Sequence, residues 1–348
     1  MTPSTSAMPK HDPPRDPSEM PHERVLVAGL GRAGLDYACT FATHPGARLA
    51  GFVESRNDLR RFARGVGFQA PSDASLLRWL TRNACDAVVV AAPPAEAPDL
   101  VEQAVRSGLA VLVHGLAAMP GPTALRIRDT LAGSERPVAA GAPIMFHPLF
   151  ARARRTGALS PERITQLRAS ASVSRVFSPL AHPGRDVLDF LLADLLLVLT
   201  ASFGGVERVK ATGTRLYGPW IDECQLEVRF ANGLVGRVDA SWSVPDYPSP
   251  AMVIECAGPD GRVIVSDDAL EMDLDSLQGR VVAASEPGRV RFDSGEQAIV
   301  AEGFLALLAG DTSVVDALSV ARAVHVAQVI EAARKSIAVA GESVGVES

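Results

Sequence analysis

A glycine-rich turn within VLVAGLGRAG, residues 25–34, is the part of this sequence whose residue types and spacing most clearly suggest chemistry. Its three glycines fit the pattern G-x-G-x-x-G. Between a strand and a helix, the first permits a tight turn, the second lets a pyrophosphate approach the backbone, and the third lets the helix lie close to the strand. The helix N-terminus adds free N–H groups and partial positive charge. A plain strand-end turn is the alternative. The predicted phosphate-binding residues are Gly29, Leu30, Gly31, Arg32, Ala33 and Gly34.

An acidic residue at the end of the next apolar run suggests which cofactor would bind. Glu54 follows the run 47–53 and lies twenty residues after Gly34. A carboxylate there can accept hydrogen bonds from the adenosine ribose hydroxyls, and it repels a 2′-phosphate. Ser55 and Arg56 come next, and this pair could instead bind a 2′-phosphate. NAD(H) is therefore favoured and NADP(H) stays open, while a solvated strand-end glutamate is the structural alternative.

Strands and helices alternate up to about residue 140, as a parallel sheet requires. The run 87–91 is continuously apolar, which is typical of a parallel strand buried on both faces. It ends at Ala92, Pro93 and Pro94, where a nicotinamide ribose would pass. The alternation predicts an α/β domain with a doubly wound parallel sheet, a Rossmann domain.

The pattern changes after Arg163, where strands follow one another. Asn232-Gly233 and Pro259-Asp260-Gly261 predict tight turns between them. We expect an α+β domain with an open, mostly antiparallel sheet and helices on one face. One long helix is predicted over 186–202 and another over 313–340. The predicted organisation is a disordered tail (1–22), an NAD(P)-binding Rossmann domain (23–141), an α+β substrate and oligomerisation domain (142–312) and a C-terminal helix that packs back across the molecule (313–348).

Composition narrows the classes of partner. The 348 residues carry a net charge of −6, which argues against nucleic acid or a membrane surface as a main partner. Four widely spaced cysteines suggest neither a zinc site nor a disulfide framework, and are expected to be buried thiols in a reducing, cytoplasmic environment. The apolar run 187–203 contains Asp189 and Asp194, so we expect a buried helix and no membrane span. No metal site is expected.

These features together resemble the glucose–fructose oxidoreductase and inositol dehydrogenase (Gfo/Idh/MocA) family over about residues 24–345. The resemblance rests on VLVAGLGRAG, VVVAAPPAEAPDLVEQAVRSGLAVLV, LEVRFANGLVGRVDASW, IECAGPDGRVIV and DALSVARAVHVAQVIEAARKSIAVAGESV, in this order. It implies a tightly bound NAD(P) and hydride transfer to or from a small carbonyl or polyol. The open C-terminal sheet could pack against its twin in a homodimer or homotetramer, although exposed polar residues alone would explain its alternating pattern equally well.

The sequence departs from the family where the resemblance places proton transfer. The family's Glu-Lys-Pro is replaced by His114-Gly115-Leu116, and the predicted helix 186–202 lacks the family's histidine. General acid–base assistance supplies about 10²–10⁴ in rate, so losing both groups would cripple alcohol–ketone chemistry. A substrate that needs less help, such as an imine, could still accept hydride, as in the thiazolinyl imide reductases, which the chain faintly resembles.

The replacement candidates for proton transfer are Asp194, His114 and His182. Asp194 would have a raised pKa among leucines, His114 ends a parallel strand, and His182 precedes the predicted helix. Each has a structural alternative: an aspartate tied to an arginine or a backbone donor, or a loop histidine bonded to the backbone. Two readings therefore stay open: an NAD(P)-dependent oxidoreductase, and a non-catalytic nucleotide-binding regulatory or scaffold protein.

Overall fold

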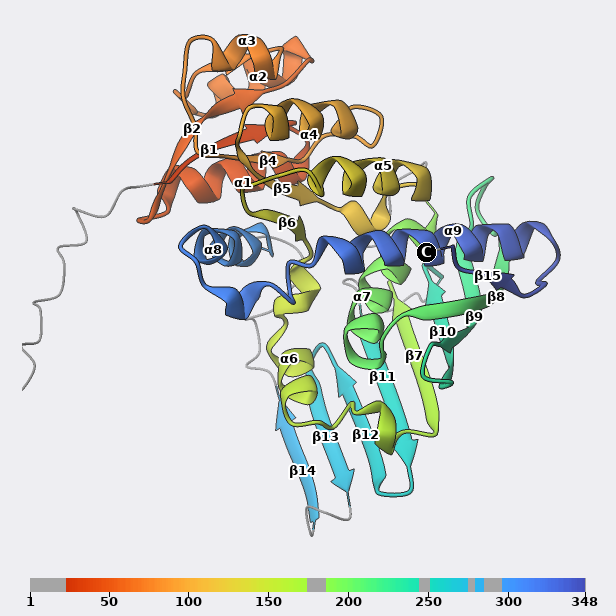
Figure 1. The fold of residues 1–348 in the computed structure, drawn as a ribbon. Helices are drawn as coiled ribbons and strands as arrows, with labels where there is room; N and C mark the ends of the chain where they lie inside the picture. The colour runs from red at the N-terminus through yellow and green to blue at the C-terminus, as the bar shows by residue number, and fades with distance from the viewer. Residues whose placement is uncertain (1–22, 174–185, 244–250, 275–278, 285–295, 348) are drawn as a thin grey trace, which may run out of the picture.

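The chain forms two sheets joined by helices (Figure 1). The computed structural model describes residues 23–173, 186–243, 251–274, 279–284 and 296–347, so the tail predicted for 1–22 lies outside the described residues. The strands are β1 (Glu23–Ala28), β2 (Ala47–Val53), β3 (Ser72–Asp73), β4 (Ala87–Val90), β5 (Ala110–His114), β6 (Val138–Gly141), β7 (Gln166–Ser172), β8 (Val206–Thr214), β9 (Glu223–Phe230), β10 (Val235–Ser241), β11 (Ala251–Gly258), β12 (Gly261–Ser266), β13 (Ala269–Leu274), β14 (Gly279–Ala284) and β15 (Val344–Gly345).

Helices cover both faces of the first sheet and one face of the second. The α-helices within the described residues are α1 (Arg32–Thr43), α2 (Asn57–Gly65), α3 (Leu76–Leu80), α4 (Ala97–Arg106), α5 (Gly121–Leu131), α6 (Pro148–Arg155), α7 (Leu191–Phe203), α8 (Glu296–Leu308) and α9 (Val320–Ala338). Short 3₁₀ turns are η2 (Leu116–Ala118), η3 (Pro143–Phe146), η4 (Pro161–Arg163), η5 (Val187–Asp189) and η7 (Thr312–Val314).

The first sheet is parallel throughout, with the strand order β3-β2-β1-β4-β5-β6. Its central strand β4 is buried at every position, as the apolar run predicts. Helices α1 and α8 pack on one face, where Tyr37 and Phe304 lie in the same apolar cluster, and α4 and α5 cover the other. This is the doubly wound Rossmann sheet expected from the strand–helix alternation.

The second sheet has the order β14-β13-β12-β11-β7-β10-β9-β8-β15 and is antiparallel except for the β7–β10 pair. Burial alternates along β9, so one face of the sheet packs inward and the other is exposed. Gly233, with φ +88°, closes the β9–β10 turn. Pro259 and Asp260 close the turn between β11 and β12. Both predicted tight turns are present, and so is the predicted α+β domain with an open, mostly antiparallel sheet.

Helix α9 connects the two sheets (Figure 1). It packs on β8 of the second sheet and on η2 and α5 of the Rossmann domain. Its predicted start at residue 313 is wrong, because the helix begins at Val320 after the Ser319 hydroxyl accepts a hydrogen bond from the Arg322 N–H. The preceding residues form the 3₁₀ turn η7 and a further turn closed by Leu318 N–H to Val314 O, and Leu318 O accepts a hydrogen bond from Ala140 N–H.

Two further expectations about helices are wrong. The helix expected over 186–202 is broken at Phe190, which separates η5 from α7, because Asp186 and Val187 are held by Ile221 of the neighbouring β8–β9 loop. Helix α8 was not expected at all, because only one long helix was predicted between the strands after Arg163. It buries Val300, Ala301 and Phe304 beside α1.

The state of the cysteines and the character of the described helices agree in most respects with what the composition predicts. All four cysteines are free thiols, and Cys39 is exposed, against the expectation that all four are buried. Among the described helices, none combines the length and the apolar character that crossing a membrane would need.

Candidate functional site

The glycine turn between β1 and α1 has the geometry that a dinucleotide requires. Gly29 adopts φ +95°, and a Cβ there would lie 2.6 Å from Ala91 O of the β4 end. A Cβ on Gly34 would lie 1.9 Å from Gly29 O, so only glycine lets α1 approach the turn. A Cβ on Gly31 would meet nothing within 4 Å. The turn is therefore closed at Gly29 and Gly34 and open at Gly31, where a pyrophosphate would approach.

The remaining residues of the turn expose the start of helix α1. Gly31 precedes the helix in an extended conformation, and the first bond inside it runs from Leu35 N–H to Gly31 O. Arg32 is exposed, Ala33 is half-buried, and Leu30 is buried in the core. The N–H groups of the first turn of a helix have no partner within the helix and form an anion-binding end.

Glu54 ties the end of β2 to this turn. It is 8% exposed, and its Oε2 accepts a hydrogen bond of 2.8 Å from Leu30 N–H. Its Oε1 accepts from Arg56 N–H at 2.9 Å, and the Ser55 hydroxyl lies 3.4 Å away. A carboxylate oxygen has two lone pairs, so Oε2, which accepts one hydrogen bond, can still accept a ribose hydroxyl. The side chain of Arg56 pairs with Asp58 on α2.

The other predicted cofactor residues follow β4. Ala92 is buried, whereas Pro93 and Pro94 are exposed. Ala91 N–H bonds to Ala28 O, which holds this segment beside the glycine turn. The structure therefore brings three predicted segments together at the carboxyl edge of the parallel sheet: the turn after β1, Glu54 after β2 and the Pro-rich segment after β4.

His114 and Gly115 lie at the end of β5 on the same edge. The His114 ring stands edge-on to Tyr37 of α1, with ring centres 5.7 Å apart. Gly115 takes φ +66°, and a Cβ on it would meet nothing within 4 Å. The position where the resemblance implies a lysine therefore supplies no side chain and leaves open space, while His114 is turned toward α1.

Asp194 lies in the first turn of α7, the helix that packs on η2 directly after Gly115. The neighbouring helix positions are buried leucines, and Asp194 itself is partly exposed. Burial raises the pKa of its carboxyl to about 7. Within the described part of the chain, no hydrogen bond or ion pair to this carboxyl is found. Part of this carboxyl is therefore protonated near neutral pH, and its helix packs on the turn that follows Gly115.

Asp186 and Asp189, the other acidic residues at this end, have a structural role. Both pair with Arg334 of α9. Asp186 is 6% exposed and also accepts a hydrogen bond from Ile221 N–H at 2.7 Å. The sequence reasoning missed Arg334, because no pattern in the alanine-rich helix distinguishes it from a surface arginine.

The remaining histidines are either structural or outside the described residues. His182 falls in the undescribed segment 174–185. His147 is 2% exposed, and burial lowers its pKa to about 4. His325 accepts a 2.8 Å hydrogen bond from Val206 N–H through Nε2, and burial lowers its pKa. Among the described residues, no cluster of histidine, cysteine and carboxylate side chains could hold a metal ion.

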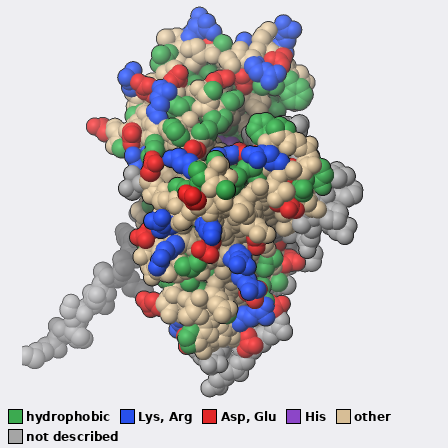
Figure 2. All heavy atoms as spheres, turned by 90° about the vertical axis from the view of Figure 1, so that its right-hand side faces the viewer, with side chains coloured by type: hydrophobic (Ala, Val, Ile, Leu, Met, Phe, Trp, Pro, Cys, Tyr) green, Lys and Arg blue, Asp and Glu red, His purple; other side chains and the backbone are tan. Residues whose placement is uncertain are grey.

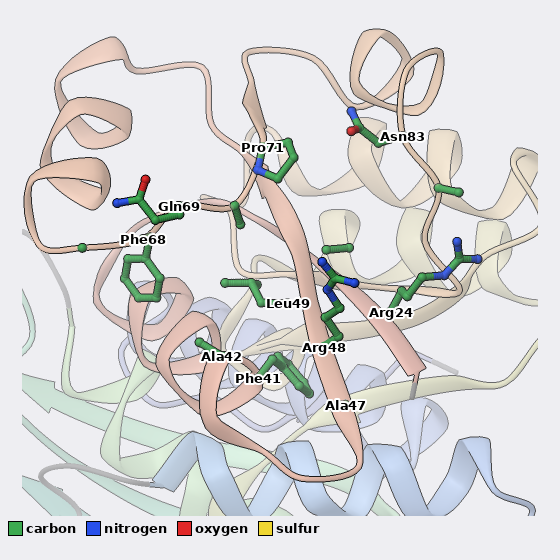
Figure 3. Close-up of a pocket in the computed structure, with 14 residues that line it drawn as sticks. Arg24, Phe41, Ala42, Ala47, Arg48, Leu49, Phe68, Gln69, Pro71 and Asn83 are labelled. Carbon is green, nitrogen blue, oxygen red and sulfur yellow. The ribbon is translucent and has the colours of Figure 1, made fainter. Parts of the chain in front are cut away.

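A surface hollow of about 620 Å³ lies elsewhere on the Rossmann domain (Figure 3). It is lined by Arg24 of β1, Arg48 and Leu49 of β2, and Phe68 and Gln69 before β3. These residues lie at the amino ends of the parallel strands, opposite the glycine turn. Arg24 is paired with Asp86. The hollow is therefore separate from the candidate cofactor site.

Comparison with known proteins also indicates an NAD-binding Rossmann domain. Residues 23–114 match the family model GFO_IDH_MocA, described as an oxidoreductase family with an NAD-binding Rossmann fold. No curated protein matches the sequence of this chain.

Solved structures share the fold of almost the whole chain. An oxidoreductase from Agrobacterium radiobacter in complex with NAD⁺, L-tartaric acid and magnesium has a TM-score of 0.77 at 16% identity, covering 94% of this chain and 99% of its own. Levoglucosan dehydrogenase in complex with NADH has a TM-score of 0.75 at 18% identity, covering 94% of this chain and 100% of its own. UDP-N-acetylglucosamine 3-dehydrogenase from Acidithiobacillus ferrooxidans has a TM-score of 0.74 at 19% identity, covering 91% and 98%.

The resemblance to Gfo/Idh/MocA oxidoreductases predicted from the sequence is thus confirmed, and the shared fold includes both sheets. At these identities the solved structures bear on the fold, while the family model bears on the domain that carries the glycine turn. Residues 23–114 are thus similar to the NAD-binding Rossmann domain of the GFO_IDH_MocA oxidoreductase family.

Proposed function

We propose that the chain transfers a hydride between NAD(H) and a small carbonyl, polyol or imine carbon bound between its two domains. The observation that supports this best is the glycine turn, which is open at Gly31 and joined to Glu54 through Leu30 N–H. These residues fit a dinucleotide: the start of α1 would bind the pyrophosphate, and Glu54 the adenosine ribose. The nicotinamide would supply or accept the hydride.

Asp194 is the group we propose for the proton. With a pKa of about 7, a fraction of its carboxyl is protonated at neutral pH and can donate to an oxygen or nitrogen that gains negative charge as hydride arrives. Gly115 leaves open space and can supply no proton. His114 stays a weaker candidate, because its ring is packed against Tyr37.

NADH is the proposed form of the cofactor. Both oxygens of Glu54 face protein donors at the end of β2, and a 2′-phosphate there would meet a buried negative charge. The Arg56 guanidinium, the cation nearest in sequence, is already paired with Asp58. Discrimination between NADH and NADPH therefore depends on the Glu54 carboxylate.

Calorimetric titration of nucleotide-free protein with NADH and NADPH tests the cofactor part. We expect NADH to bind at least tenfold more tightly. In Glu54→Gln this ratio should fall about tenfold, since one charge-assisted hydrogen bond is worth about 1.5–3 kcal/mol. The control is Asp129→Asn, an exposed carboxylate on α5, which should leave both affinities unchanged. Wild-type protein that binds neither nucleotide contradicts the proposal.

A second candidate function is a nucleotide-binding protein without turnover. It is favoured by the missing side chain at Gly115 and by the packing of the His114 ring against Tyr37, which weaken two of the positions where a proton donor is expected. Offering NAD⁺ with levoglucosan or myo-inositol, and NADH with L-sorbose or 1-pyrroline, separates the readings. Tight NADH binding without any turnover supports the non-catalytic reading, and turnover of 1-pyrroline alone supports an imine reductase.

We also propose that the protein forms a homo-oligomer and is located in the cytoplasm. The exposed face of the nine-stranded sheet would pair with a second copy to give a homodimer or homotetramer, and the free thiols suit a reducing cytoplasm. Sedimentation at several concentrations tests the assembly. On the side seen in Figure 2, acidic and basic side chains are interspersed, which fits the expectation that nucleic acid is not a partner.

A further inference from the structure

Arg60 on α2 binds the main chain at the end of β2, next to the carboxylate assigned to the adenosine ribose. Its Nη1 donates to the carbonyl oxygens of Glu54 and Ser55, the latter at 3.1 Å. Its Nη2 lies 3.4 Å from Asn57 Oδ1. The side chain is half-buried, and within the described residues its guanidinium forms no ion pair. Hydrogen bonds from a charged donor are the stronger kind, so Arg60 fixes the conformation of this strand end.

The other contacts of Glu54 hold its amide and its carboxylate. Glu54 N–H donates to Asp73 O of β3 at 3.0 Å, and the carboxylate accepts from Leu30 N–H and Arg56 N–H. Among the described residues, only Arg60 donates to the Glu54 carbonyl. Without that bond, the peptide group after Glu54 is free to rotate, and the direction of the Glu54 side chain changes with it.

The neighbouring arginines of α2 and its start make different contacts. The Arg56 side chain pairs with Asp58. Arg61 is exposed, and it forms no hydrogen bond or ion pair within the described ranges of the chain. Arg60 therefore differs from Arg61 in what it binds and not in its charge, which makes Arg61 a matched control.

Recognition of a ribose hydroxyl depends on how the Glu54 carboxylate is oriented. Oε2 accepts one hydrogen bond from Leu30 N–H and keeps a lone pair for a further donor. A hydrogen bond weakens steeply when donor and acceptor are misaligned. A change in the backbone of Glu54 would therefore weaken the contact with the hydroxyl, even though the carboxylate itself is still present.

We infer that Arg60 is a positioning residue for the nucleotide. By holding the carbonyl oxygens of Glu54 and Ser55, it orients the Glu54 carboxylate toward the 2′-hydroxyl of the adenosine ribose. It thereby sets the preference of the site for ribose over 2′-deoxyribose. This inference rests on the proposed function, because the ribose is assigned to Glu54 there. Arg60 acts through Glu54, so its loss should alter the recognition of one hydroxyl and leave the pyrophosphate contacts in place.

Calorimetric titration of the nucleotide-free protein with ADP and with 2′-deoxyADP measures this preference. In the wild type we expect ADP to bind about tenfold more tightly, which is in the range of one charge-assisted hydrogen bond. In Arg60→Met the ratio should fall to about twofold, because only ADP has the hydroxyl whose contact is weakened. An equal loss of affinity for both nucleotides would show a general effect of charge or folding, and it overturns the inference.

Two further variants separate positioning from charge. Arg61→Met removes the same charge from the same helix and should leave the ratio at its wild-type value. Arg60→Lys keeps a charged donor without the fixed geometry of the guanidinium, so its ratio should lie between those of the wild type and Arg60→Met. If Arg60→Met does not fold, Arg60→Lys decides the question. A wild-type ratio in the folded Arg60 variant, or an equal fall in Arg61→Met, overturns the inference.

Hydrogen exchange at Leu30 N–H tests the same positioning without a nucleotide. This amide belongs to a fully buried residue and is bonded to Glu54 Oε2. Its exchange should be about tenfold faster in Arg60→Met and unchanged in Arg61→Met, because a displaced carboxylate no longer protects it. Unchanged exchange in Arg60→Met overturns the inference.

The binding data also separate this inference from the proposed function. If the wild type binds neither NADH nor ADP, the proposed function fails and the inference fails with it. If the wild type binds NADH and prefers ADP to 2′-deoxyADP, but Arg60→Met keeps the full preference, only the inference fails.

Discussion

Burial acts in opposite directions on two side chains, Asp194 and His147. It raises the pKa of the Asp194 carboxyl to about 7 and lowers that of the His147 imidazole to about 4, because a poorly hydrated site disfavours the charged form of either group. His147 therefore lowers stability as the pH falls from 6.5 toward 4, where the unfolded chain binds the proton more readily. Asp194 has the opposite effect.

We predict that Asp194→Asn stabilises the protein at alkaline pH. The folded state holds the Asp194 proton up to about pH 7, whereas the unfolded chain releases it near 3.8, so rising pH through that window costs the wild type stability. The variant should gain about 2 kcal/mol at pH 8, half of the full shift because the side chain is partly exposed. Thermal melts from pH 4 to 8 measure this gain, which should vanish at pH 4.

The same variant tests the proposed proton transfer. Its kcat/KM should fall by about 10²–10⁴, and the decline in the wild-type reduction rate above pH 7 should disappear. The control is Asp239→Asn on β10, whose carboxyl also has a pKa raised by burial. An Asp194→Asn enzyme with full activity would show that another group supplies the proton.

Individual residues were predictable where a local pattern carries the chemistry. Glycine spacing and strand-end position were enough to propose Gly29, Gly31, Gly34 and Glu54 as cofactor-binding residues without any tertiary information. The Leu30–Glu54 hydrogen bond and the packing of His114 against Tyr37 were not predictable, because each joins segments whose distance depends on the completed sheet. The pattern on α7 identified Asp194 as a candidate, but its lack of a described partner depends on the surrounding fold.

At the scale of elements, Arg334 of α9 is expected to fix the start of α7. We predict that Arg334→Met lowers the free energy of unfolding by about 2–3 kcal/mol, because it leaves Asp186 buried without its cation. Chemical denaturation measures the loss. Because Asp186 also holds Ile221, the β8–β9 loop, residues 215–222, should loosen and Trp220 should become more accessible to acrylamide.

Arg322→Met is the matched control for this prediction. Arg322 also lies on α9 and pairs with an aspartate, Asp316, but that partner is 51% exposed. Surface pairs are worth about 0–1 kcal/mol, so the control should lose less than 1 kcal/mol and leave Trp220 unchanged. Equal losses in the two variants would contradict the role given to Arg334.

The C-terminal segment protects an edge of the second sheet. β15 pairs with β8, the Ser336 hydroxyl bonds to Glu342 O, and Lys335 pairs with Glu347. We predict that deleting 342–348 lowers the melting temperature and promotes self-association, because an open strand edge can pair with another chain. Differential scanning calorimetry and light scattering measure these effects. Deleting only 346–348 keeps β15 and should have the smaller effect.

Elements were predictable where the hydrophobic period is unambiguous. The continuous run of β4 and the alternation along β9 led directly to the observed strands. The break at Phe190 was not visible, because hydrogen bonds to Ile221 override a sequence that favours one helix. Helix α8 was missed because its apolar residues do not form one clear stripe, yet its buried side chains complete the core beside α1.

At the scale of the whole molecule, the two sheets share one apolar core. A single cluster of buried side chains extends from Leu26 and Val88 of the Rossmann sheet, through Leu192 of α7 and Val329 of α9, to Val263 of the second sheet. Sequence reasoning predicted two domains but could not show whether their cores are separate, since that depends on where α7 and α9 pack. The continuity favours cooperative unfolding.

We predict that the two domains unfold in one transition, and that NADH shifts this transition as a whole. Trp79 of the Rossmann domain and Trp242 of the second sheet are buried reporters of the two parts. In a Trp220→Phe background, adding Trp79→Phe or Trp242→Phe leaves one reporter, and the two melting curves should coincide. At NADH concentrations of about 100 times Kd, both should gain about 2.7 kcal/mol. If the Trp79 curve alone moves with NADH, the domains unfold separately, and α9 connects them without coupling their stabilities.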